Sequence, residues 1–171
     1  MSQYSVRHAK PGELSALIAI DDAASRLYET VGITFDMADD HPFVVAESER
    51  WARAIEQGAA FVAVESGESP VGFIALKRVD NEPYLDQLSV HPDHMRQGLG
   101  ARLLSQAIQW SGDHPLWLTT YAHVQWNKPF YERYGFYQVP ANLCGPELLA
   151  ILDGQRVALP EPDQRIAMVR T

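Results

Sequence analysis

The sequence predicts an α/β fold of the α+β kind, with a central mixed, mostly antiparallel sheet of about seven strands flanked by helices. Three observations predict it. Short runs of alternating apolar residues recur along the 171 residues, and longer segments with helical spacing lie between some of them. The middle strands follow one another through short turns, which is typical of an antiparallel meander. One strand–helix–strand step predicts a parallel pair.

The N-terminal third of the chain predicts one strand followed by two helices. Tyr4 to Ala9 alternates apolar with polar side chains, which is typical of a short strand. Glu13 to Tyr28 predicts the first helix and Ser48 to Gln57 the second, which Gly58 ends. The stripe at helical spacing in the first helix consists of Leu14, Leu17, Ile18, Asp21 and Ala24.

Between those two helices, Gly32 to Val45 predicts an irregular loop. It mixes apolar with acidic residues, including Asp36, Asp39 and Asp40. Its apolar residues follow neither the helical period nor the alternation of a strand. A loop of this length either carries function or simply connects two elements, and the sequence leaves both interpretations open.

The central part predicts three strands joined by short connections: Ala59 to Glu65, Val71 to Val79 and Tyr84 to Val90. Turn-forming residues from Glu65 to Pro70 predict a hairpin between the first two strands. Asn81 to Pro83 joins the second strand to the third. Consecutive strands with such short connections favour antiparallel pairing.

The C-terminal part continues with alternating strands and helices. Pro115 to Tyr121 predicts a strand, Asn127 to Tyr134 a short helix with proline in its first turn, and Phe136 to Val139 another strand. Ile166 to Arg170 predicts the last strand. Before it lies a segment from Pro140 to Gln164 that is longer than a hairpin needs and would hold an added helix started by a proline.

Composition limits the classes of protein and of partner. Apolar residues make up 46% and charged residues 21%, as in an ordinary globular chain, so we expect a single domain over residues 1–171. The formal charge of -8 argues against nucleic acid and anionic membranes as partners and is compatible with a cationic one. Cys144 is the only cysteine, so no internal disulfide forms. We expect neither a signal peptide nor a membrane span, and therefore a cytoplasmic protein.

The stretch from Leu85 to Leu104 combines a strand, a glycine-containing turn and a helix. The apolar stripe of this helix consists of Leu99, Leu103, Leu104, Ala107 and Ile108. The first amides of a helix have no intrahelical partner and the helix dipole favours negative charge there, so the arrangement predicts an anion site. Gly98 and Gly100 would let a phosphate approach the backbone closely.

Three phosphate-binding patterns contain such a turn, and the residues of this sequence exclude two of them. The dinucleotide-binding fingerprint needs a third glycine where Leu103 stands, and a P-loop needs Gly-Lys-Ser/Thr where Gly100 is followed by Ala101 and Arg102. The third pattern fits. The stretch resembles the acetyl-CoA pyrophosphate loop of the GNAT superfamily of N-acetyltransferases, Gln/Arg-x-x-Gly-x-Gly/Ala, with Gly98 and Gly100 at its small positions.

One departure and one further motif bear on this resemblance. Met95 stands at the first loop position, where Gln or Arg is usual, but Arg96 and Gln97 beside it are typical of the loop. Further along, Asn127 to Phe136 resembles the GNAT pattern Asn-x-x-(apolar)-x-x-Tyr-x-x-x-Gly-Phe, with one residue fewer between Asn and Tyr than some members show. Asn127 and Tyr131 would share one helix face. The resemblance covers nearly the whole chain and implies the GNAT fold, with a sheet splayed at the acetyl-CoA site.

The resemblance also implies a chemistry: acetyl-CoA as co-substrate, no metal, and direct attack of an amine on the thioester in a ternary complex. The amide of Leu88 would stabilise the oxyanion, Val90 would pair with the pantetheine arm, and Tyr131 would protonate the leaving thiolate. Asp86 or His123 would be the base, although a solvent-facing strand end and a surface-loop histidine are their ordinary explanations. The implied acetyl-CoA contacts are Leu88, Ser89, Val90, Met95, Arg96, Gln97, Gly98, Leu99, Gly100, Ala101, Asn127, Phe130 and Tyr131.

We expect the acceptor to be a small amine and the protein to be a monomer or a homodimer. In a GNAT, the Gly32–Val45 loop and the Pro140–Gln164 insertion would close a peptide groove, which disfavours acetylation of protein N-termini or lysines. The insertion can equally be a packing or dimer element. An acyl-CoA-binding regulatory module without turnover is the other alternative, and the presence of both Asn127 and Tyr131 favours the enzyme. Carboxylates from Asp36 to Asp40 at the mouth of the pocket would favour a cationic amine.

Overall fold

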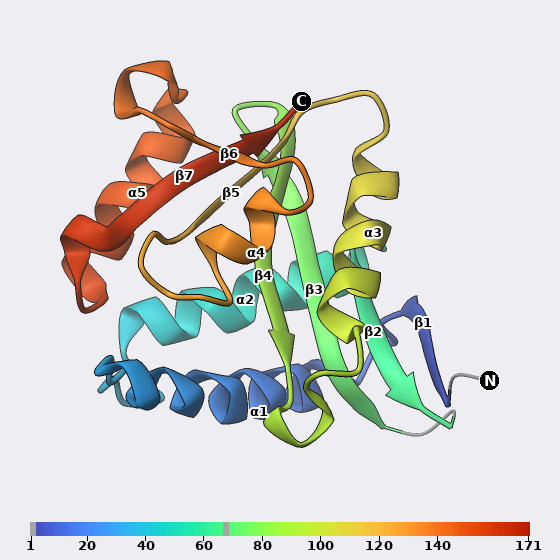
Figure 1. The fold of residues 1–171 in the computed structure, drawn as a ribbon. Coiled ribbons are helices and arrows are strands. Elements are labelled where there is room, and N and C mark those ends of the chain that lie inside the picture. Colours follow the sequence, from blue (N-terminus) through green and yellow to red (C-terminus); the bar gives the residue numbers. More distant parts are fainter. Residues whose placement is uncertain (1–2, 67–68) are drawn as a thin grey trace. The chain divides into compact units, whose positions relative to one another are not determined.

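The computed structural model describes residues 3–66 and 69–171 of the chain. Figure 1 shows its helices and strands in sequence colours. The strands are β1 Tyr4–His8, β2 Ala60–Glu65, β3 Pro70–Val79, β4 Glu82–Val90, β5 Leu116–Tyr121, β6 Tyr137–Val139 and β7 Arg165–Arg170. The α-helices are α1 Leu14–Ser25, α2 Pro42–Glu56, α3 Leu99–Ser111, α4 Lys128–Glu132 and α5 Pro146–Ala158.

The strands form a mixed sheet in the hydrogen-bonded order β1-β2-β3-β4-β5-β7-β6, which confirms the predicted fold class. By its internal contacts the chain divides into two compact units. Unit 1 consists of Met1–Leu76 and Gln87–Trp110, and unit 2 of Lys77–Asp86 and Ser111–Thr171. A single domain and a splay of the sheet remain predictions.

In unit 1, β2 pairs antiparallel with β1 from Tyr4↔Glu65 to His8↔Phe61, and with β3 on its other side. Every residue of β2 from Ala60 to Val64 is buried, because neighbouring strands and helices enclose it. Trp51 of α2 packs edge-to-face on Phe73 of β3, with 5.1 Å between ring centroids. Trp51 is 2% exposed and Phe73 has no exposed surface, so this pair is part of the apolar core of unit 1.

Four of the five residues of the apolar stripe predicted for α3 are buried in unit 1, and Ile108 is half-buried. Leu103, Leu104 and Ala107 have no exposed surface, and Leu99 is 2% exposed. A Cβ built on Gly72 would lie 3.2 Å from the carbonyl oxygen of Ser89 and 3.3 Å from Cδ1 of Leu103, so glycine allows β3, β4 and α3 to pack closely. This packing places the N-terminus of α3 directly after β4.

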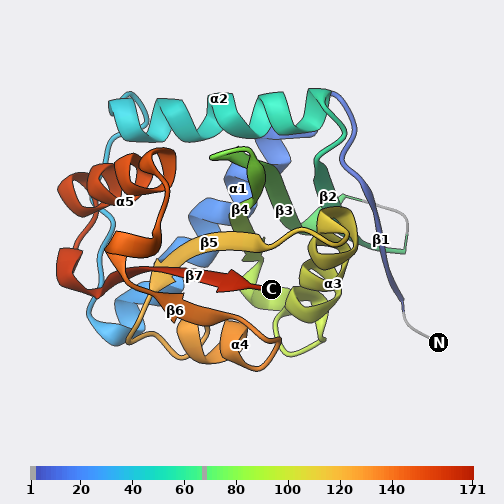
Figure 2. The same ribbon diagram turned by 90° about the horizontal axis from the view of Figure 1, so that it is seen from above.

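Unit 2 contains the parallel pair that the strand–helix–strand step predicts. Tyr84 and Leu85 of β4 pair with Trp117 and Leu118 of β5 in parallel. The last strand, β7, lies antiparallel between β5 and β6. Figure 2 shows α5 and α4 on opposite faces of these strands. The α5 face packs through Val79, Tyr84, Leu148 and Ala167.

The start of α2 differs from the predicted one. The Gly32–Val45 segment was expected to be irregular throughout, but the helix begins at Pro42. Nδ1 of His41 accepts a hydrogen bond from the amide of Phe43 at 3.1 Å and caps the helix. Proline is favourable in a first helical turn because the amide it lacks would have no intrahelical partner. The prediction was therefore wrong for residues 42–45, where proline starts a helix.

Two connections are also tighter than predicted. The residues Arg26–Val31 form a 3-10 helix, so the first α-helix ends at Ser25 and not at Tyr28. The turn between β3 and β4 uses Asp80 and Asn81, both left-handed with φ of 52° and 62°, as in the tight turns of hairpins. In the hairpin predicted from Glu65 to Pro70, residues 67–68 lie outside the described part of the chain.

The added helix is present as α5, and a residue far away in the sequence caps it. Oδ1 and Oδ2 of Asp80 accept hydrogen bonds from the amides of Glu147 and Leu148 at 2.8 and 3.0 Å. In return, Oε1 of Glu147 accepts from the amide of Asp80 at 2.8 Å. The N-cap residue of α5 is Gly145, and a side chain there would collide with the Asp80 carboxylate. Asp80 therefore caps α5 in place of the N-cap residue Gly145, which has no side chain to do so.

This capping makes a stability prediction. Asp80→Gly keeps the left-handed turn favourable but removes both acceptors, so we expect the free energy of unfolding to fall by about 1–2 kcal/mol in chemical denaturation. Asn81→Gly is the matched control, because Asn81 has the same left-handed backbone. The control should be neutral or slightly stabilising. Equal stability of the two variants would show that the cap contributes nothing.

Candidate active site

The predicted strand–turn–helix is present in unit 1. β4 ends at Val90, a 3-10 turn covers Pro92–His94, and Arg96 and Gly98 adopt left-handed φ angles of 63° and 75° before α3 begins. The amide of Arg102 donates to the carbonyl of Gly98 at 3.1 Å. The amides of the first helical turn, which precede Arg102, therefore have no i−4 carbonyl within the helix and lie at its positive end. This arrangement can hold an anion.

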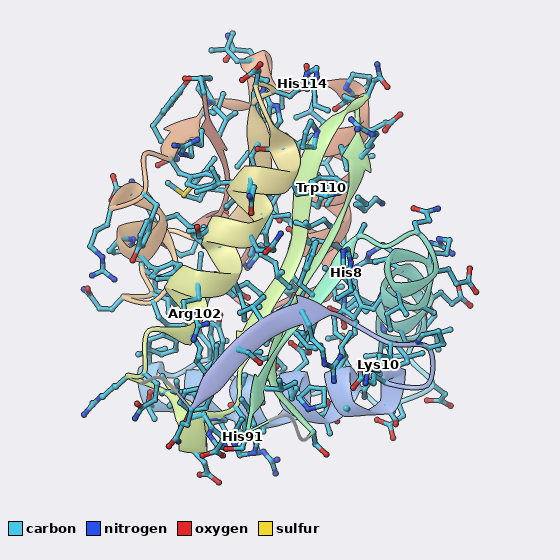
Figure 3. The ribbon with its side chains drawn as sticks, turned by 90° about the vertical axis from the view of Figure 1, so that its right-hand side faces the viewer. His8, Lys10, His91, Arg102, Trp110 and His114 are labelled. Atoms are coloured by element: carbon cyan, nitrogen blue, oxygen red, sulfur yellow. The ribbon has the colours of Figure 1, made fainter. Side chains whose placement is uncertain are left out.

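Contacts on both sides hold this turn in place. The amide of His91 donates to the carbonyl of Val71 at 2.8 Å. The hydroxyl of Tyr4 lies 3.0 Å from Nδ1 of His94, and Arg102 donates to the carbonyl of Tyr4 at 3.1 Å. Figure 3 shows His91 after β4 and Arg102 near the start of α3. Tyr4 of β1 is thus linked to the turn at His94 and to α3 at Arg102, which limits the motion of the turn.

Different structural requirements explain the glycines at positions 98 and 100. Gly98 needs its left-handed backbone, and a Cβ built on it meets no atom within 4 Å. Gly100 lies within α3, where glycine is a poor helix former and the backbone does not require it. A close approach of a ligand to the backbone would explain Gly100.

The strand before the turn carries a contact that the sequence did not predict. The hydroxyl of Ser89, which is 6% exposed, donates to Oδ1 of Asp21 on α1 at 2.9 Å. Nε2 of Gln87 donates to the same oxygen at 3.0 Å. Asp21 was predicted only as a member of the stripe at helical spacing in α1, among apolar residues. A carboxylate in such a stripe was the available signal, because a buried charge needs polar partners.

The second motif lies in unit 2 and has the predicted spacing. Asn127 is the N-cap residue of α4, and the amide of Tyr131 donates to its carbonyl at 3.1 Å, so the two residues are one helical turn apart. Oδ1 of Asn127 accepts from Thr120 at 2.7 Å and from the amide of Tyr121 at 3.2 Å. The side chain of Asn127 therefore joins the end of β5 to the start of α4.

The ring of Tyr131 is held by other aromatic rings. It is 8% exposed and lies 5.2 Å from the ring of Phe130 and 5.6 Å from that of Phe136. Both neighbours meet it edge-on, which is a favourable geometry for aromatic pairs. The phenol thus has a fixed position, as a proton donor needs.

The two candidate bases differ in exposure. Asp86 is half-buried near the middle of β4. His123 is exposed in the loop after β5, where its ring meets that of Tyr121 at 5.7 Å. Both are in unit 2, and their roles stay predictions. Burial raises the pKa of the Cys144 thiol, and the Asp80 carboxylate raises it further, so this cysteine is a poor nucleophile.

Two features are absent from the described residues. No three histidine, cysteine or acidic side chains of residues 3–66 and 69–171 gather as a metal site would require. Within the same residues, no helix is long and apolar enough to cross a membrane.

The model of the acetyltransferase (GNAT) family matches residues 17–136, which include both the glycine turn and Tyr131. The chain belongs to the GNAT family. It is an acetyl-CoA-dependent acetyltransferase, as the sequence predicted.

Relatives of this GNAT chain agree in sequence and in fold. The uncharacterized N-acetyltransferase YafP of Escherichia coli (strain K12) is 30% identical over 139 residues, which cover 81% of this chain and 85% of the relative. The PaiA N-acetyltransferase of Thermoplasma acidophilum, solved in complex with coenzyme A, superposes with a TM-score of 0.66 at 18% identity over 100% of this chain and 99% of that one. Arabidopsis thaliana Naa50, solved with the bisubstrate analogue CoA-Ac-MVNAL, gives 0.66 at 16% identity over 99% of each chain. At these identities the two structures show the fold alone.

Proposed function

We propose that this GNAT enzyme transfers the acetyl group of acetyl-CoA to the primary amine of a small molecule, by direct attack in a ternary complex. The observation that carries the proposal is the anchored turn from Val90 to Leu99, whose left-handed Arg96 and Gly98 lead into the amides of α3. Backbone amides at a helix N-terminus suit the pyrophosphate of the co-substrate.

In this proposal each motif has one task. Amides from Arg96 to Ala101 hold the pyrophosphate, Val90 pairs with the pantetheine arm, and the amide of Leu88 stabilises the oxyanion. The amine nitrogen bonds to the thioester carbon, the carbon–sulfur bond breaks, and Tyr131 gives its proton to the leaving thiolate. The amine loses its proton to a base, for which Asp86 and His123 stay the candidates.

The nature of the acceptor is the less constrained part of the proposal. Support for a small molecule comes from the Gly32–Val45 and Pro140–Gln164 segments, which in a GNAT would close a peptide groove. An extended peptide needs an open surface, and an added helix reduces that surface. The runner-up is a peptide amine, because Naa50, which shares the fold, was solved with a peptide-bearing analogue. Fold alone does not decide between them.

A panel of acceptors tests this function. We expect the full chain to release CoA from acetyl-CoA, detected with a thiol reagent, when small primary amines are supplied, and the acetylated amine to appear by mass spectrometry. Peptides with free N-termini and peptides with lysine are the comparison. Turnover with peptides only would overturn the small-molecule proposal, and acetyl-CoA binding without any turnover would favour the regulatory module. A cytoplasmic location and a monomer or homodimer remain parts of the proposal.

A further inference from the structure

Two side chains at the end of β4 bind to one carboxylate of α1. Oγ of Ser89 and Nε2 of Gln87 both donate to Oδ1 of Asp21, at 2.9 and 3.0 Å, and Nε2 of Gln87 also donates to Oγ of Ser89 at 3.0 Å. Ser89 is buried, and Asp21 and Gln87 are half-buried. Figure 1 shows the end of β4 beside α1. Asp21 therefore anchors this part of the strand to a helix.

The two anchored side chains flank Leu88. Successive side chains of a strand point to opposite faces, so Gln87 and Ser89 share the face that meets α1, and Leu88 points away from it. A slip of the strand by one residue would turn both anchored side chains to the wrong face. A rotation of the strand about its axis would carry both away from Oδ1 of Asp21. The two hydrogen bonds thus fix the backbone on either side of Leu88.

The backbone contacts of β4 show where the Leu88 amide points. The amide of His91 donates to the carbonyl of Val71 on β3 at 2.8 Å. The carbonyl oxygen of Ser89 lies 3.2 Å from a Cβ built on Gly72, also on β3. Neighbouring residues of a strand present their peptide groups to opposite edges, so the Leu88 amide points away from β3. It lies outside the ladder between β3 and β4, as a donor to an oxyanion requires.

Resting on the proposed function, in which the Leu88 amide stabilises the oxyanion, we propose that Asp21 is a positioning residue for this amide. Its Oδ1 holds the two flanking side chains of β4 and so keeps the amide directed at the oxyanion. Asp21 acts through the strand and not by contact with a substrate. Its contribution belongs to kcat, because the oxyanion forms only in the transition state.

Asp21→Ala tests this assignment by removing the shared acceptor. We expect kcat to fall about 10- to 100-fold, because a catalytic group misplaced by about 1 Å can cost about 100-fold in rate. The KM for acetyl-CoA should stay unchanged, since the contacts of Tyr4 with His94 and Arg102 hold the pyrophosphate turn. CoA release with the best acceptor gives both constants. Calorimetric titration with acetyl-CoA counts the folded sites, so misfolded protein is not mistaken for slow protein.

Asp22→Ala is the matched control, because Asp22 is the exposed neighbour of Asp21 on α1 and loses the same charge. Its kcat should equal that of the wild type. If kcat per folded site is the same in the Asp21→Ala and Asp22→Ala variants, the inference is overturned. A fall in Tm with an unchanged kcat would likewise make Asp21 a purely structural tether of α1.

A double-mutant cycle with Ser89 shows whether Asp21 acts through β4. Ser89→Ala removes one of the two strand donors and should lower kcat by itself. In the Asp21→Ala background the same substitution should cost much less, because the hydrogen bond is already absent and contacting residues are not additive. Fully additive losses in kcat would show that the two residues act separately and would overturn the inference.

Two further outcomes separate this inference from the proposed function. The oxyanion forms on the thioester whichever amine attacks, so if only peptides react, the small-molecule function fails and the same kcat comparison is made with the peptide. If nothing turns over, the amide resonance of Leu88 is followed by NMR. Acetyl-CoA, compared with CoA, should shift this resonance in the wild type and shift it less in Asp21→Ala. Equal shifts, or no shift in the wild type, overturn the inference.

Discussion

Replacing Tyr131 with phenylalanine is expected to lower kcat by about 100- to 10,000-fold, the usual value of a general acid. The variant keeps the ring that packs against Phe130 and Phe136 and removes only the hydroxyl. Acetyl-CoA affinity and Tm should therefore change little. The measurement is kcat with an acceptor for which the chemical step limits the rate, together with acetyl-CoA binding by calorimetry.

Tyr134→Phe is a suitable control for this experiment. Tyr134 follows α4, is 36% exposed and also contacts Phe130, with 5.2 Å between ring centroids and an angle of 54° between the ring planes. The same atom is removed a few residues away, so kcat should stay near the wild-type value. If the Tyr131 variant turns over as fast as this control, the phenol merely packs and has no part in proton transfer.

Gly98→Val should weaken acetyl-CoA binding by about tenfold or more, since a left-handed backbone costs a side-chain-bearing residue about 1–2 kcal/mol and the turn must rearrange to avoid it. No atom lies within 4 Å of a Cβ on Gly98, so the valine would also project into the open space beside the turn. There it would crowd a bound phosphate. Calorimetric titration with acetyl-CoA measures the effect.

Gly112→Val separates ligand binding from backbone strain. Gly112 is also left-handed, with φ of 59° against 75° at Gly98, and a Cβ there also meets nothing within 4 Å. Both variants should lose similar stability in thermal denaturation, but only Gly98→Val should lose affinity. A Gly98→Val protein that binds acetyl-CoA like the Gly112→Val control would remove the turn from the cofactor site.

The sequence by itself determined the helices, strands and turns whose residues follow a short-range pattern. The stripe from Leu99 to Ala107 predicted α3, because each of these side chains returns to the same face after one turn. The glycine turn and the Asn127–Tyr131 spacing are local as well, and their geometry follows from short-range steric rules. The parallel pairing of β4 with β5 was predicted from the helix that joins them, because a strand–helix–strand connection typically links parallel strands.

The tertiary structure alone decided which distant side chains meet. Asp21 pairs with Ser89 across 68 positions, and Asp80 caps α5 through the amide of Glu147 across 67. A hydrogen bond between such residues leaves no periodic trace in the sequence, because it depends on how strands and helices pack and not on neighbouring side chains. For the same reason a carboxylate in the α1 stripe was visible in the sequence, while its partners Ser89 and Gln87 came only from the packing of α1 beside β4.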